Sequence, residues 1–169
     1  MSRFCERVAR PASTGWNLAK TALQIVVCWS WFYALLPSWV SRAERAWVPG
    51  AVWTPAASTR VAALAVFATF GAVALASAWV FAKYGRGTPL PADTTRKLVI
   101  AGPYRYVRNP MAVTGVAQFA AVAIWHGSTI LLSLAAFALL IWNYVIRPWE
   151  ERQLSARFGP PYEVYRRRV

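Results

Sequence analysis

Three long apolar segments constrain this chain more than any other feature. They run over Asn17–Val40, Ser58–Ala82 and Met111–Trp149. Roughly 20 apolar residues in a helix cross the hydrocarbon core of a bilayer, so each of the first two segments is long enough to cross once. The third is about twice that length and is interrupted near its middle, which predicts a hairpin of two helices turning at His126-Gly127. The sequence therefore predicts an all-α integral membrane protein with about four transmembrane helices.

The basic residues are distributed unevenly around these segments. The chain has 19 lysines and arginines against 6 acidic residues, a formal net charge of +13. Most of the cations precede the first predicted helix, separate the second from the third, or follow the fourth. These are Arg3, Arg7, Arg10, Lys83, Arg86, Arg96, Lys97, Arg105, Arg108, Arg147, Arg152, Arg157 and Arg166–Arg168. The three regions share one side of a four-helix protein, so the positive-inside rule predicts cytoplasmic N- and C-termini.

The remaining two loops carry few cations, namely Arg42, Arg45 and Arg60. The excess charge is thus explained by membrane topology, and no nucleic-acid-binding fold accompanies it, so we expect no nucleic-acid partner. The two cysteines, Cys5 and Cys28, form no C-x-x-C or Cys/His pattern, and we expect no metal site. The single histidine, His126, is interpreted as a turn or interface residue.

Polar chemistry is expected in two segments, the loop Lys83–Pro110 and the tail Arg147–Val169. A short turn at His126-Gly127 brings the start of the third predicted helix and the end of the fourth to the same side of the membrane. The loop and the tail should therefore meet in space and build a composite pocket. The Gly85-x-Gly87 pair in the loop lacks the third glycine and the preceding strand of a dinucleotide fingerprint, so a cofactor pocket here is not of the Rossmann type.

The loop ends with the sequence GPYRYVRNP over residues 102–110. Pro110 suits the first turn of the following helix, so Arg108 and Asn109 should be exposed at a helix N-terminus. Such a terminus attracts carboxylates and phosphates. In the tail, the adjacent Glu150 and Glu151 face a loop that is rich in arginine, and two interpretations stay open. They neutralise Arg147 or Arg152 as interfacial ion pairs, or they take part in a functional site.

Two motifs at matched spacing resemble a known family. GPYRYVRNPM at 102–111 is followed about forty residues later by E-E-R-Q-L-x-x-R-F-G-x-x-Y-x-x-Y at 150–165. The pair resembles the isoprenylcysteine carboxyl methyltransferase family, with its bacterial relatives and the related phospholipid methyltransferases. The resemblance covers residues 83–169 and implies two parts, a segment 1–82 with two packing transmembrane helices and a methyltransferase-like core 83–169. It also implies an integral protein of a bacterial inner membrane.

The resemblance implies S-adenosyl-L-methionine as cofactor, bound between the loop and the tail. The residues that it places along the cofactor are Tyr104, Arg105, Tyr106, Val107, Arg108, Asn109, Pro110, Glu150, Glu151 and Tyr162, with Tyr162 and Tyr165 at the cytosolic rim. Arginine suits the carboxylate of this cofactor, glutamate its ammonium or ribose, and tyrosine its adenine or sulfonium. Arg108, Asn109, Glu150 and Glu151 are the implied catalytic residues. Asn109 and Ala112 depart from the histidine and tyrosine that some members carry at these positions.

The expected function is methyl transfer to a lipophilic acceptor, with the carboxylate of an isoprenylcysteine as one candidate. Phospholipid ethanolamine or small-thiol methylation by the same scaffold is an alternative. A carboxylate acceptor needs no deprotonation at neutral pH, whereas an amine such as phosphatidylethanolamine needs a base, for which Glu150 or Glu151 would have to serve. A non-catalytic four-helix protein whose basic face binds lipid or a partner is a further alternative.

Overall fold

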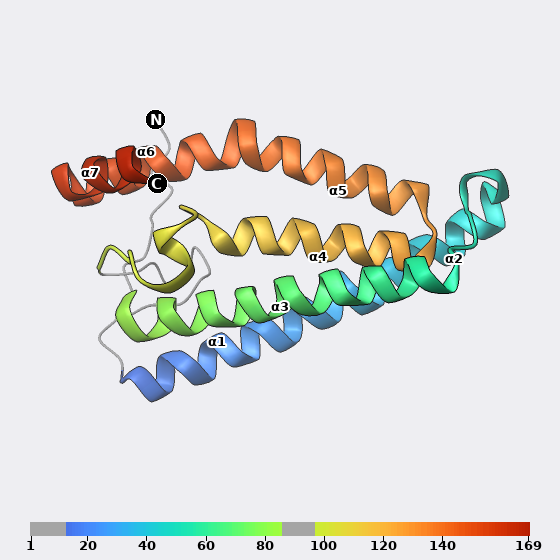
Figure 1. Cartoon of the computed structure of the whole chain (residues 1–169), viewed down its shortest axis with the longest axis horizontal. Helices are drawn as coiled ribbons and strands as arrows, with labels where there is room; N and C mark the ends of the chain where they lie inside the picture. The colour runs from blue at the N-terminus through green and yellow to red at the C-terminus, as the bar shows by residue number, and fades with distance from the viewer. Residues whose placement is uncertain (1–12, 86–96) are drawn as a thin grey trace.

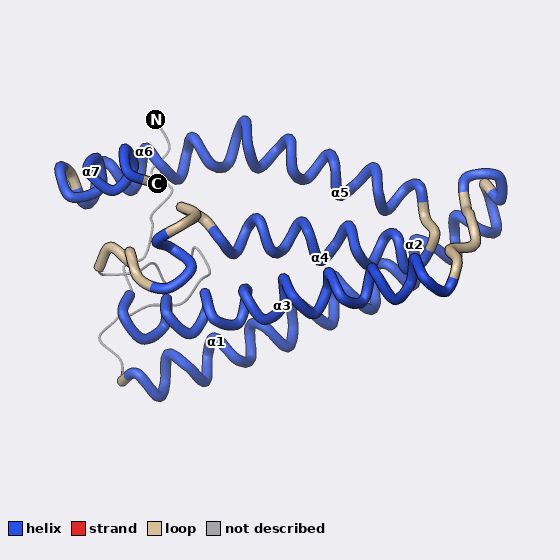
Figure 2. The backbone as a smooth tube through the Cα atoms, in the orientation of Figure 1, coloured by secondary structure: helices blue, strands red, loops and turns tan. Residues whose placement is uncertain are grey.

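The computed structural model describes residues 13–85 and 97–169, and every regular element in these ranges is a helix. The long helices lie side by side along one axis (Figure 1), and most of the described chain is helical in the tube of Figure 2. Three of the helices are long and apolar enough to cross a membrane. An all-helical membrane protein was predicted, and these described residues confirm it.

The first long helix runs from Gly15 to Trp47, 33 residues. It comprises α1 (Thr14–Trp29), the π-helical η1 (Ser30–Leu35) and α2 (Leu36–Trp47). The side chain of Ser13 caps it by accepting a hydrogen bond from the backbone N–H of Trp16 at 3.2 Å. α2 continues past the predicted end of this helix at Val40 to Trp47 and reaches past the other helices in Figure 1.

The second long helix, α3 (Ala57–Gly85), closely matches the predicted segment and buries mainly small residues. These are Ala63, Gly71, Ala74, Ser77, Ala78, Ala82 and Gly85. α4 (Pro110–His126) packs along them. A Cβ atom at Gly71 would lie 3.3 Å from Nε2 of Gln118 and 3.4 Å from the Trp29 ring, which is tight contact. Gly71 therefore allows these helices to approach closely.

The predicted hairpin is confirmed, with its turn between α4 and α5 (Thr129–Ile141). Gly127 has φ +62°, and a Cβ there would lie 1.9 Å from the Trp53 carbonyl oxygen, so no other residue fits this turn. α4 has 17 residues. At 1.5 Å per residue it is about 25 Å long, somewhat short of a bilayer core of about 30 Å. A fourth transmembrane helix thus stays a prediction.

The third long helix runs from Thr129 to Phe158, 30 residues. It comprises α5, the π-helical η5 (Trp142–Ile146) and α6 (Arg147–Phe158), and so continues past the predicted end at Trp149. Gly159, with φ +59°, ends α6, and the short α7 (Pro160–Arg168) follows. Two short 3-10 helices, η2 (Pro49–Ala51) and η4 (Gly102–Arg105), lie in the connections.

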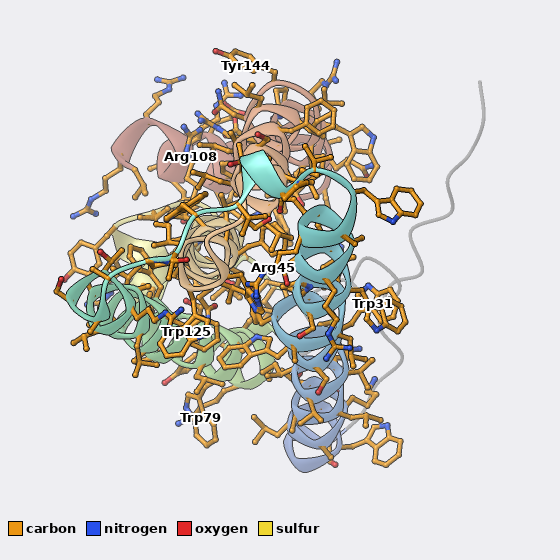
Figure 3. All side chains as sticks on the ribbon, turned by 90° about the vertical axis from the view of Figure 1, so that its right-hand side faces the viewer. Trp31, Arg45, Trp79, Arg108, Trp125 and Tyr144 are labelled. Atoms are coloured by element: carbon orange, nitrogen blue, oxygen red, sulfur yellow. The ribbon has the colours of Figure 1, made fainter. Side chains whose placement is uncertain are left out.

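The bundle has two chemically different ends. The turn end contains Gly127 and Ser128 with α2 and η2, and the loop end contains η4, the start of α4, and α6. Figure 3 looks at the turn end and shows Arg45 pointing inward, whereas Trp31, Trp79 and Tyr144 lie on the periphery. Five of the basic residues used to predict the topology lie outside the described residues. They are Arg3, Arg7, Arg10, Arg86 and Arg96. Which side of a membrane each end faces stays a prediction.

Candidate functional site

Asn109 lies at the centre of a polar cluster at the loop end. It is the N-cap of α4, where its Oδ1 accepts a hydrogen bond from the backbone N–H of Ala112 at 3.1 Å. Its Nδ2 donates a hydrogen bond to Oε2 of Glu150 at 3.0 Å. One amide thus completes the helix terminus and also binds α6, so the loop and the tail converge as the sequence predicted.

Arg108 makes the second contact between the loop and the tail. Its guanidinium lies 2.8 Å from Oε1 of Glu151, and Arg147 lies 3.0 Å from the same oxygen. Arg147 also donates to Oδ1 of Asn143 at 3.0 Å. The side chains of Arg108 and Glu151 are 25% and 18% exposed, so this pair is only partly shielded from solvent. One carboxylate oxygen therefore pairs with two guanidiniums.

These contacts correct one expectation and confirm another. Arg108 and Asn109 are half-buried instead of exposed, because the carboxylates of α6 draw both side chains into contacts. The interfacial ion pair predicted between the glutamates and Arg147 is confirmed at Glu151. Arg152, the other candidate partner, donates to the Pro148 carbonyl at 3.2 Å.

The tail also reaches the loop through two tyrosines of α7. The hydroxyl of Tyr165 donates a hydrogen bond to the Tyr104 carbonyl oxygen at 2.7 Å. Tyr104 is itself buried, and its ring lies 5.9 Å from that of Phe81 on α3. Burial raises the pKa of Tyr165 to about 12, so its phenol is neutral and able to donate at physiological pH.

Tyr162 is the most buried large side chain of the tail, at 1% exposed. Its hydroxyl has no hydrogen-bond partner within the described part of the chain. Burial raises the pKa of Tyr162, the nearby Glu151 carboxylate raises it further, and the Arg108 guanidinium lowers it. A buried hydroxyl without a partner costs about 1–3 kcal/mol, so this group beside charged side chains requires an explanation. The resemblance placed Tyr162 and Tyr165 at the cytosolic rim of a cofactor pocket, and both side chains are buried in the structure.

The backbone of η4 holds the loop against α3. Gly102 has φ +57°, and a Cβ there would lie 2.9 Å from Cγ2 of Val80. Only glycine allows the backbone of η4 to approach α3 this closely. The side chain of Tyr104, two residues later, is buried. Pro110 is buried at the first turn of α4. Tyr106 is 82% exposed, and Arg105 and Val107 are exposed as well, so the structure does not bring these three into the cluster.

Two members of the cluster were not predicted as site residues. Asn143 binds Arg147, and Arg147 binds Glu151, each across four residues of one continuous helix. The i, i+4 spacing of Asn143, Arg147 and Glu151 is a signal that could have identified them. Over residues 13–85 and 97–169, no group of three His, Cys, Asp or Glu side chains is placed to hold a metal ion.

Comparison with known proteins agrees with the resemblance only at the level of a broader family. The sequence model of a family described as phospholipid methyltransferase matches residues 58–160. Methanethiol S-methyltransferase 2 of Bradyrhizobium diazoefficiens is 30% identical over 157 residues, which are 90% of this chain and 55% of that protein. The chain thus spans about half the length of this curated relative. No solved structure matches it significantly.

Proposed function

The chain belongs to the phospholipid methyltransferase family, and we propose that it transfers a methyl group from S-adenosyl-L-methionine to a lipophilic acceptor. The convergence of Arg108 and Asn109 with Glu150 and Glu151 is the observation that carries this proposal. All four residues lie within the matched range 58–160. Residues 83–169 form the methyltransferase core in this proposal, and residues 1–82 supply the helices that pack against it.

The donor groups of the cluster fit this cofactor. It presents a carboxylate, an ammonium, hydroxyls and an adenine, which need a cation, carboxylates and aromatic surface. Arg108 supplies the cation, Glu150 and Glu151 supply the carboxylates, and Tyr104 and Tyr162 supply the rings. The partnerless hydroxyl of Tyr162 supports the assignment, because a ligand that offers a hydrogen-bond partner would satisfy it. The proposed contact set also includes Pro110, which is buried next to Asn109, and the exposed residues Arg105, Tyr106 and Val107, which lie outside the cluster.

When bound, S-adenosyl-L-methionine supplies an electrophilic methyl group on a sulfonium. The residues of the chain then act by alignment and by exclusion of water, because a displacement at carbon depends mainly on the approach of the two reacting atoms. Asn109 orients the Glu150 carboxylate through the bond from Nδ2, and Glu151 holds Arg108 in place. These four residues are the catalytic and binding groups of the proposal.

The acceptor is proposed to be apolar and to reach the site from the membrane. The exposed, apolar surface of the long helices supports this, since such surface is typical of helices that contact lipid. The carboxylate of an isoprenylcysteine is one candidate. It carries its own nucleophilic oxygen at neutral pH and requires no base.

A small thiol is the second candidate, because the relative from Bradyrhizobium diazoefficiens is named for methylating methanethiol. A thiol must lose its proton before its sulfur can form the new bond to carbon. Glu150 is the base in this case. One oxygen of its carboxylate accepts the thiol proton while Asn109 donates a hydrogen bond to the other oxygen, Oε2.

Purified protein in lipid nanodiscs, supplied with S-adenosylmethionine labelled in its methyl group, tests the proposal. Three acceptors are compared, a prenylcysteine analogue, phosphatidylethanolamine and methanethiol, and the labelled product identifies the acceptor class. Arg108→Gln is expected to abolish labelling. Arg167→Gln, the same substitution at an exposed residue of α7, is the matched control and should retain it.

The non-catalytic alternative predicts a different result. Calorimetry with S-adenosylhomocysteine should show binding that Arg108→Gln weakens and Arg167→Gln does not. If none of the three acceptors gains the label and S-adenosylhomocysteine does not bind, the results favour a four-helix scaffold whose basic surface contacts anionic lipid or a partner protein.

A further inference from the structure

We propose that Glu44 is a positioning residue that fixes, from the turn end, the helix whose other end carries Glu150 and Glu151. This inference rests on the proposed function, because the position of the two glutamates matters only if they act on a ligand. Glu44 belongs to α2, far from the candidate site. It is nevertheless among the most buried polar side chains of the described residues, at 1% exposed.

Both carboxylate oxygens of Glu44 hold the start of α5. Oε1 accepts a hydrogen bond from the backbone N–H of Ile130 at 2.9 Å, and Oε2 accepts one from the hydroxyl of Ser128. The Ser128 oxygen in turn accepts from the backbone N–H of Leu131 at 3.1 Å. A helix leaves its first N–H groups without intrahelical partners, and a carboxylate there is also favoured by the helix dipole. Glu44 and Ser128 therefore form a clamp on this terminus.

Little else fixes this helix along its length. Of the residues from Thr129 to Phe158, only Leu131 and Ala135 are buried, and both lie in its first two turns. The six residues 136–141 are all exposed. Six residues exceed one helical turn, so no face of this stretch carries a buried side chain. Lipid can cover such a surface, but it does not define one position for the helix.

The contacts at the loop end cannot fix the position of this helix by themselves. The pair between Arg108 and Glu151 is partly exposed, and pairs of this kind are individually weak. In the proposed function these same groups bind the cofactor, so they must be free to change partners. The contacts of Glu44 take no part in that exchange and can hold the helix throughout.

The length of the helix makes the position of Glu150 sensitive to a small tilt at the turn end. Twenty residues at 1.5 Å each place Glu150 about 30 Å from Ile130 along the helix. A tilt of about 2° at the turn end would then shift Glu150 by about 1 Å. A misplacement of about 1 Å can lower the rate of an aligned reaction by up to about 100-fold.

A spin-label distance measurement tests the inference. Labels are attached at Tyr144→Cys and Tyr84→Cys, two exposed positions near the loop end on η5 and α3, after Cys5 and Cys28 are replaced by serine. Glu44→Ala should broaden the distance distribution in nanodiscs. Glu44→Gln should restore it, because the amide oxygen can still accept from Ile130 and the amide nitrogen can donate to the second lone pair of Ser128.

A matched control separates this effect from general loosening of the turn end. The Ser41 hydroxyl lies 3.1 Å from Nδ1 of His126, so Ser41→Ala breaks a contact between α2 and α4 without touching α5. Its distance distribution should stay narrow. Methyl transfer should follow the same order, with kcat about tenfold lower in Glu44→Ala and near the original value in Glu44→Gln and Ser41→Ala.

Two results would overturn the inference: an unchanged distribution in folded Glu44→Ala, or equal broadening in Ser41→Ala. Should Glu44→Ala fail to fold, Glu44→Asp replaces it, because its shorter side chain cannot keep both contacts and should give partial broadening. The distance measurement requires no methyl transfer. A protein that proves inactive toward every acceptor therefore leaves the positioning result standing, whereas an active enzyme with unchanged distances rejects the positioning role alone.

Discussion

Asn109 donates a hydrogen bond to Glu150 at 3.0 Å across 41 residues of sequence, while its other side-chain atom caps α4. One residue therefore connects the stability of a helix terminus to the position of a carboxylate at the candidate site. The two roles use different atoms, since Oδ1 serves the cap and Nδ2 serves Glu150. They can therefore be separated by substitution.

Asn109→Ser and Asn109→Ala make this separation. Serine is about as good an N-cap as asparagine but is too short to reach Glu150, whereas alanine loses both contacts. Both substitutions lose the bond to Glu150, and we expect Asn109→Ala to lower the free energy of unfolding by about 1 kcal/mol more than Asn109→Ser, because only alanine also loses the cap. Both should weaken binding of S-adenosylhomocysteine by about tenfold, the equivalent of one hydrogen bond to a charged group. Chemical unfolding and calorimetry measure the two effects, and unchanged binding in Asn109→Ser would contradict the role assigned to Glu150.

Tyr162→Phe and Tyr165→Phe should have opposite consequences for the unliganded protein. Tyr162→Phe removes a buried hydroxyl without a partner, so stability should stay equal or rise by up to about 1 kcal/mol. Tyr165→Phe removes a hydroxyl that donates to the Tyr104 carbonyl and should lower stability by about 1 kcal/mol. Binding of S-adenosylhomocysteine should weaken about five- to tenfold in Tyr162→Phe, as measured by calorimetry. A clear loss of stability in Tyr162→Phe would show that its hydroxyl already has a partner.

Segment length was sufficient to predict much of the fold. The length and interruption of residues 111–149 predicted the hairpin, and Gly127 occupies its turn. The extension of the first helix from Val40 to Trp47 was not predicted. α2 buries Pro37, Ser41 and Glu44 on one face against the hairpin turn, and a polar residue on such a face is stabilised only by partners that are distant in sequence. The clamp at Glu44 therefore could not be read from hydropathy.

The sequence was sufficient to predict that the loop and the tail meet at the site, but not which of their residues contact each other. The turn at His126-Gly127 implied that the loop and the tail share one end of the bundle. Which glutamate binds Asn109 and which binds Arg108 depends on the rotation of α6, and the π-helical η5 directly before it alters that rotation. The burial of Tyr162 depends on the direction of α7, which the positive φ of Gly159 determines.

Gly102→Ala tests whether η4 must lie close to α3. The added Cβ would meet Cγ2 of Val80 at 2.9 Å, and the residue would keep a φ of +57° that alanine disfavours. We expect a loss of about 1–2 kcal/mol in stability and weaker cofactor binding, because the loop before Arg108 is displaced. Gly50→Ala is the control, since a Cβ there has no heavy atom within 4 Å. Equal melting temperatures for the two variants would show that η4 tolerates movement.

The pKa of Tyr165 predicts how the tail responds to alkaline pH. Burial raises this pKa to about 12 from the ordinary value of 10.0, so the folded protein holds the phenol proton more tightly than the unfolded chain. The unfolded state therefore binds fewer protons between these values, and stability falls as pH rises through this interval. Below pH 10 the group contributes no pH dependence, because it is protonated in both states. Stability measured against pH should thus decline less steeply in Tyr165→Phe than in the original protein above about pH 10. Parallel curves for the two proteins would show that the Tyr165 hydroxyl titrates as it does in water, and that its bond to the Tyr104 carbonyl is not kept in the folded state.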